Sequence, residues 1–179
     1  MNRMILIAML SFTTICLSQE KMISKSGMIT FEASVDSFEE VKATNNNVTF
    51  VLNPTTGEIA SLALVKGFRF KVALMEEHFN ENYIESDQYP KALFKGKIEG
   101  FDMDKLTANP KNFSLKGTLE LHGKSKEINV TAKISKSTAG INLSSNFAVN
   151  ASDFSISIPS LVKSKVSNKI NLQIAVLFK

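Results

Sequence analysis

The chain has 179 residues, of which 44% are hydrophobic and 21% are charged, and this composition excludes a disordered protein. Its 8 glycines and 4 prolines are too few for a fibrous or low-complexity class. The net charge of +4 comes from lysines spread singly along the chain, whereas a nucleic-acid surface gathers its cations and is usually rich in arginine. We therefore expect one domain with one packed core and no nucleic-acid partner.

The first eighteen residues have the pattern of a secretory signal peptide. Arg3 supplies the positive start, residues 4–17 are largely apolar, and the small residues Cys16 and Ser18 stand at the −3 and −1 positions of a cut after Ser18. A membrane anchor is the first alternative, but the apolar stretch is short for about 20 spanning residues and no basic cluster follows it. A lipoprotein leader is the second, and it would need a small residue where Ile15 stands.

Cleavage after Ser18 would leave a mature domain of residues 19–179 in the periplasm or outside the cell, with no stable membrane span. It would remove Cys16, the only cysteine, so the mature domain would have neither a disulfide nor thiol chemistry. A domain of about 160 residues needs no disulfide, because its core alone buries enough surface. Loss of Arg3 would lower the net charge from +4 to +3.

Apolar and polar residues alternate with a period of two along most of the chain after residue 27. This pattern predicts strands with one buried and one solvated face. In chain order, the clearest runs cover residues 48–52, 68–72, 94–98, 113–121, 128–134, 141–149 and 170–178.

Short turn sequences separate several of these runs, at residues 53–57, 122–125 and 137–140. Such short turns join antiparallel neighbours. Six or more antiparallel strands must either close or form a sandwich to cover their edges. We predict closure, and therefore an all-β antiparallel barrel.

One segment, residues 74–84, departs from the strand pattern. Met75, Phe79 and Tyr83 recur every four residues, which is typical of an amphipathic helix of about three turns that ends before Pro90. We expect this helix to pack its apolar stripe on the barrel, at one end.

The polar residues form no known catalytic or metal-binding motif. The only histidines are His78, in the predicted helix, and His122, in a predicted turn, and there is no H-x-x-x-H or C-x-x-C spacing for zinc. Asp102 and Asp104 lack the glycine of a calcium loop, and neither G-x-S-x-G nor a glycine-rich nucleotide loop is present. We predict no catalytic residues, no metal and no cofactor.

The interior of the barrel is then the candidate site, because a closed barrel of about eight strands holds either its own side chains or one small ligand. Gly96 and Gly117 interrupt apolar strand faces. They either leave room for an apolar chain or mark bends in the barrel.

Two stretches resemble the signatures of the YceI-like family. In the first, His78 lies on a short helix, and Tyr89 and Pro90 precede a strand centred on Phe94. The second is a hairpin of the form L-x-L-H-G-x-x-K, which here covers residues 119–126. The order and separation of the two signatures also match, and the resemblance continues to the alternating C-terminal strand.

The resemblance implies a lipocalin-like, extended antiparallel barrel of eight strands, exported to the bacterial periplasm or beyond. It implies an elongated cavity for a polyisoprenoid, a quinone-like molecule or a fatty amide, a binding role without catalysis, and a homodimer. Residues 23–31 depart from the family's opening strand, D-x-x-H-S, because they contain no histidine. This departure leaves open a barrel filled by its own side chains.

The candidate cavity lining combines large inward side chains with residues of the helix and of the two signatures. It comprises Phe31, Phe50, Phe68, Phe70, Met75, His78, Phe79, Tyr83, Tyr89, Phe94, Leu119 and Phe147. His78 is either a polar handle on a ligand head group at the mouth or a helix residue hydrogen-bonded to a loop. Tyr83 and Tyr89 either line the mouth or pack, since an aromatic ring with one polar tip suits both roles.

Three functions follow from these observations. The one we predict is an exported binder of an apolar chain, whose affinity would grow by about 0.8 kcal/mol per buried methylene. The second is an exported structural or stress-related protein with a filled barrel, which would not respond to lipid. The third is a hydrolase of a lipid-like substrate, in which His78 would serve a nearby serine as base.

Overall fold

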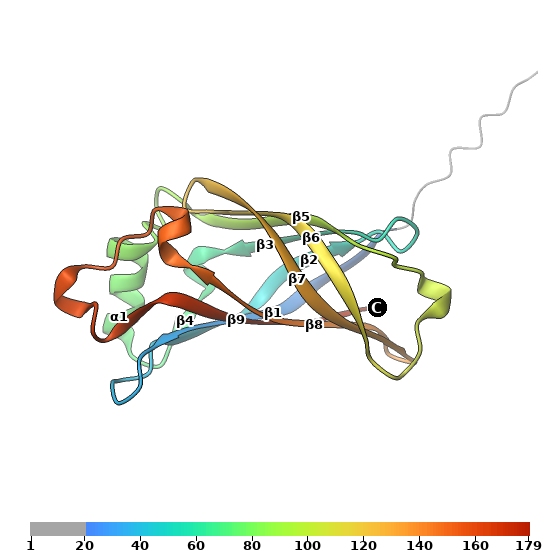
Figure 1. Cartoon of the computed structure of the whole chain (residues 1–179), viewed down its shortest axis with the longest axis horizontal. Helices are drawn as coiled ribbons and strands as arrows, with labels where there is room; N and C mark the ends of the chain where they lie inside the picture. Colours follow the sequence, from blue (N-terminus) through green and yellow to red (C-terminus); the bar gives the residue numbers. More distant parts are fainter. Residues whose placement is uncertain (1–20) are drawn as a thin grey trace, which may run out of the picture.

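A computed structural model describes residues 21–179, and the predicted signal peptide lies outside the described residues. The described part contains one α-helix, short helical turns and strands in an elongated arrangement (Figure 1). The elements are β1 (Met22–Ser34), β2 (Lys42–Leu52), β3 (Glu58–Leu64), β4 (Arg69–Phe70), α1 (Ala73–His78), β5 (Lys91–Ile98), β6 (Lys111–Leu121), β7 (Lys124–Ser137), β8 (Gly140–Asn150) and β9 (Val166–Phe178).

The strands form one antiparallel sheet that closes on itself. The order is β1-β9-β8-β7-β6-β5-β3-β2, and β1 pairs again with β2. The two-residue strand β4 extends the sheet on β2 beyond the end of β3. This closure confirms the predicted eight-stranded antiparallel barrel and excludes the alternative of a sandwich.

The strand predicted at residues 68–72 is wrong in its bounds, because only Arg69–Phe70 is extended and paired. Within the described chain these residues pair with β2 alone, and α1 begins soon after them, at Ala73. Where β3 ends, Nδ2 of Asn45 donates to the Leu64 carbonyl over 3.0 Å. The chain then turns through a 3-10 helix at Val65–Gly67, so the alternating residues that follow form only the two-residue strand β4.

Strand β3 was not expected from the alternation. Its inward residues include Ile59, while its outward side chains Ala60 and Leu62 are also apolar. With both faces apolar, the period-two signal is weak, and only pairing with β2 and β5 identifies the strand.

The helix predicted at residues 74–84 is present. The α-helix α1 is followed directly by a π-helical turn, Phe79–Tyr83. It lies at one end of the barrel, together with the loop between β1 and β2 and the loop between β8 and β9 (Figure 1). We call this end the hollow end.

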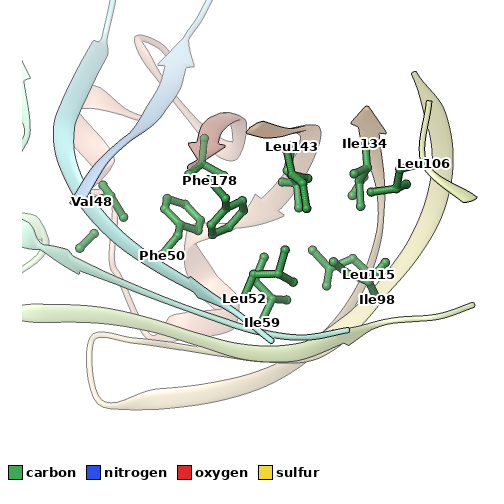
Figure 2. Packing of buried hydrophobic residues seen from close by; sticks show 14 of the residues in the cluster. Val48, Phe50, Leu52, Ile59, Ile98, Leu106, Leu115, Ile134, Leu143 and Phe178 are labelled. Carbon is green, nitrogen blue, oxygen red and sulfur yellow. The ribbon is translucent and has the colours of Figure 1, made fainter. Parts of the chain in front are cut away.

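At the opposite end, the barrel is filled with side chains (Figure 2). Leu52, Ile98, Ile134 and Phe178 are all at most 1% exposed. The loop between β5 and β6 adds Leu106, which is 7% exposed, to this cluster. We call this end the packed end.

Candidate functional site

The hollow end encloses a cavity of about 490 Å³, within the range of about 300–1,000 Å³ that is common for small-molecule sites. Its walls are the inward side chains of the barrel strands. Beyond the strands, it is bordered by Phe38 and Glu39 of the β1–β2 loop, by Met75 and His78 of α1, and by four residues of the β8–β9 loop: Ile156, Ile158, Val162 and Lys165.

The chemistry of the lining changes from the walls to the mouth. The wall side chains are mostly aliphatic or aromatic, such as Val130 on β7 and Leu172 on β9. The charged side chains Glu39 and Lys165 and the imidazole of His78 all belong to the exposed end segments. This arrangement suits a molecule with a hydrocarbon part inside and a polar group at the mouth.

Ser145 is a polar residue among the wall side chains and is 4% exposed. Its hydroxyl donates to the Thr131 carbonyl on β7 over 2.8 Å. The hydroxyl proton is therefore already used within the sheet, and the position adds little polarity to the cavity.

The structure brings together most of the residues proposed from sequence. Those that line the cavity are Phe31, Phe50, Phe68, Phe70, Met75, His78, Phe79, Tyr83, Phe94, Leu119 and Phe147. Tyr89 does not line it. Its ring packs against that of His122, with centroids 4.4 Å apart, and a Cβ on Gly123 would stand 2.8 Å from it.

An aromatic cluster attaches the helical segment to the barrel wall. The ring of Phe79 lies 5.2 Å from that of Phe31, 5.3 Å from Phe70 and 6.2 Å from Phe68, measured between centroids. These are ordinary separations for favourable tilted or edge-to-face pairs. These ring contacts hold the helical segment against the barrel wall, and all four rings line the cavity.

The two strand glycines accommodate another cavity side chain. Gly96 and Gly117 face each other in an uninterrupted β5–β6 register, so neither marks a bulge there. A Cβ on Gly96 would stand 2.6 Å from Cζ of Phe94, and a Cβ on Gly117 would stand 2.7 Å from the same atom. The ring of Phe94 therefore lies over the two glycines, close to the sheet.

The two histidines have different surroundings. His78 is exposed at the rim of the cavity, and its ring makes no hydrogen bond to any residue from 21 to 179. His122 has a side chain only 9% exposed, and both ring nitrogens are engaged. The geometry therefore favours the rim interpretation of His78 over a bond to a loop.

His122 joins three segments of the hollow end. Its Nδ1 lies 3.0 Å from the Phe154 carbonyl, and its Nε2 lies 2.8 Å from Oε2 of Glu85. Both partner atoms are acceptors, so both ring nitrogens must donate for both contacts to be hydrogen bonds. We call these contacts the His122 junction. They tie the β6–β7 hairpin to the segment after the helix and to the turn Ala151–Phe154.

Ion pairs at the hollow end shift two carboxyl groups without entering the cavity. A hydrogen bond from Lys126 is the main reason that the pKa of Asp153 lies below its usual value. A hydrogen bond from Lys71 does the same to the pKa of Glu40. Both carboxylates are solvent-exposed, so these pairs contribute little to stability.

Sequence reasoning missed the lining from the β8–β9 loop, which includes Ile156, Ile158 and Val162. The alternation Ile156-x-Ile158 before Pro159 was an available signal. Neither residue belongs to a strand, however, so no pattern of pairing could have oriented them toward the interior.

Within residues 21–179, no group of three or more His, Cys, Asp or Glu side chains is placed to hold a metal ion. In the same part of the chain, no helix has the length and apolar character needed to cross a membrane.

Comparison with known proteins relates the chain to a family of barrels. The family model described as the YceI-like domain matches residues 18–178. A polyisoprenoid binding domain from Saccharophagus degradans has a TM-score of 0.77 at 14% identity. The alignment covers 89% of this chain and 97% of that one.

Two further solved structures share the fold. BcnA from Burkholderia cenocepacia has a TM-score of 0.71 at 13% identity, with 86% of this chain and 96% of that chain covered. The YceI protein of Campylobacter jejuni has a TM-score of 0.60 at 20% identity, with 80% and 88% covered. A search of curated proteins found no match. At these identities, the structural likeness establishes the fold alone.

Proposed function

This chain belongs to the YceI-like domain family, and from that premise we propose that its barrel binds one apolar chain ligand at the hollow end. The ligand class is a polyisoprenoid, a quinone-like molecule or a fatty amide. The observation that carries the proposal is the cavity of about 490 Å³ with hydrocarbon walls and charged groups only at its mouth. The similar Saccharophagus degradans structure is itself described as a polyisoprenoid binding domain.

The walls supply binding energy by removing apolar surface from water, at about 0.8 kcal/mol per methylene. The polar group of the ligand stays near His78 and Lys165, where water also reaches. A charged head deep in the barrel would lose hydration without a partner, and this cost favours the tail-first orientation.

The first test is native mass spectrometry of residues 19–179 purified from a bacterial host, followed by organic extraction. We expect a bound apolar species of defined mass that is lost on extraction. A bare protein mass that stays unchanged after exposure to farnesol and to oleamide would support the filled-barrel alternative and overturn the proposal.

A series of n-alkanols from ten to fourteen carbons tests the energetic basis. Each added methylene should tighten binding by about fourfold until the cavity is full. Competition with the apolar fluorophore N-phenyl-1-naphthylamine provides the readout. Affinity that is independent of chain length would contradict burial inside the barrel.

We further propose a binding role without catalysis. His78 lies at the rim beside an apolar wall, a suitable position for contacting a head group. His78→Gln should therefore change head-group preference and leave alkanol binding intact. Hydrolysis of a p-nitrophenyl ester by the wild type, lost in His78→Gln, would instead establish the hydrolase alternative.

Export is part of the proposal, and it rests on the leader pattern of residues 1–18. Expression of the full chain in a bacterium should yield a periplasmic protein that begins at Gln19. Intact mass of the periplasmic fraction measures this. An uncleaved chain that stays with the membrane would indicate an anchor.

A further inference from the structure

Large apolar side chains that face solvent are concentrated at one end of the molecule. Among the described residues, the exposed ones are Ile23, Phe38, Leu64, Val72, Leu74 and Leu161. All of them except Ile23 belong to segments of the hollow end. These segments are the β1–β2 loop, the last residue of β3, the start of α1 with the residue before it, and the β8–β9 loop. Scattered exposed leucines need no explanation, but a gathering at one end does.

Three of these side chains belong to segments that border the cavity. Phe38 is 46% exposed and is itself part of the lining. Leu74 is 57% exposed beside the lining residue Met75, and Leu161 is 89% exposed beside the lining residue Val162. They come from three separate segments of the same end (Figure 1). The segments that border the cavity therefore expose large apolar side chains to solvent.

We propose that the hollow end docks on a lipid bilayer, with Phe38, Leu74 and Leu161 inserted at its interface. The inference rests on the proposed function, because an apolar ligand with a polar head resides in a bilayer before it enters the barrel. Apolar side chains on two loops and on the first turn of α1 match a flat, deformable apolar phase. A cavity mouth held against that phase lets a ligand pass without crossing water.

Charges beside Leu161 are compatible with a bilayer that contains anionic lipid. Lys163 and Lys165 follow it in the same loop, and neither forms an ion pair with a carboxylate within residues 21–179. Lysines can extend their ammonium groups toward lipid phosphates while their stems remain near the apolar boundary. Acidic residues such as Glu77 and Glu81 on the helical segment limit this attraction. Insertion of the apolar side chains therefore dominates over charge.

The test is vesicle flotation of residues 19–179 with liposomes of phosphatidylethanolamine and phosphatidylglycerol. The variant Leu74→Ser/Leu161→Ser removes two inserted side chains, neither of which lines the cavity. We expect its partition coefficient to fall by at least about tenfold. Ile23→Ser is the matched control, since Ile23 is 56% exposed, almost as much as Leu74, but lies at the opposite end. It should bind as the wild type does.

A wild type that does not float, a double variant that floats equally well, or an equal loss in Ile23→Ser would overturn the docking proposal. So would a wild-type dimer that ignores vesicles and becomes monomeric in the double variant, because the surface would then join two copies of the chain. N-phenyl-1-naphthylamine titration without vesicles separates the two proposals. The double variant should bind the probe as the wild type does. A wild type that floats with vesicles but does not bind the probe would refute the ligand proposal and leave the docking proposal intact.

Discussion

The packed and hollow ends of the barrel are built from the same strands with the same alternation. Strands β8 and β9 show this in one ladder. The facing pair Ile141 and Phe178 is at most 2% exposed, within the side-chain cluster. The facing pair Val149 and Ile170, further along the same two strands, is half-buried and lines the cavity.

The segment that covers each end accounts for the difference. At the packed end, the β5–β6 loop inserts Leu106 into the cluster. At the hollow end, α1 has no buried residue, and the aromatic cluster holds it at the rim. The hollow end is therefore maintained by ring contacts and the His122 junction, and the packed end by hydrocarbon packing. The same kind of side-chain substitution should therefore change the free energy of unfolding by different amounts at the two ends.

The largest contrast is expected for leucine truncation. Leu52→Ala at the packed end should lower the free energy of unfolding by about 2–5 kcal/mol, because Leu52 is fully buried. Leu119→Ala at the cavity wall should cost clearly less, since that side chain is only half-buried. Urea unfolding of both variants measures the difference. Equal losses would mean that the cavity wall is as tightly packed as the core.

Removal of the His122 junction should rank next. His122→Asn keeps a residue that tolerates the φ of +50° at this position. It should lower the free energy of unfolding by about 1.5–3 kcal/mol, through loss of a hydrogen bond to a charged group. His78→Asn at the exposed rim is the control and should change stability by less than about 0.5 kcal/mol. A similar value for both would leave the junction without a structural role.

Enlarging a side chain should distinguish empty from filled space. Val176→Phe at the packed end should cost about 1–3 kcal/mol in stability, because Val176 is 5% exposed within the cluster. Val149→Phe should cost less and should weaken binding of N-phenyl-1-naphthylamine, because the ring would occupy cavity volume. Urea unfolding and probe titration test the pair. Unchanged probe affinity in Val149→Phe would place the probe elsewhere.

The smallest effect concerns the ion pair of Lys126 and Asp153. The pKa of Asp153 is lowered in the folded state, so the pair stabilises at neutral pH, and this contribution is lost as pH falls through that lowered pKa. Lys126→Met should raise the pKa of Asp153 toward its usual value. A carboxyl ¹³C NMR titration records the change. An unaltered titration would show that Lys126 is not the main cause.

Periodicity alone predicted much of the barrel. Antiparallel strands, their turns, the helical segment and most wall residues follow from it, because alternation is a local property of each strand. It was wrong for residues 68–72, of which only Arg69–Phe70 is paired, with β2 alone, before α1 begins at Ala73. The family signature, and not the periodicity, put Tyr89 among the candidate lining residues, and its ring packs on His122.

The sequence by itself determined the strand faces, and so which side chains point inward, such as Ile141 and Val149 on β8. Tertiary structure alone decided that the first is buried in a filled core and the second faces a cavity. The physical reason is that packing depends on what covers each end, here Leu106 or the rim-held helix α1. Those segments come from distant parts of the chain, and no local pattern encodes how deeply they enter.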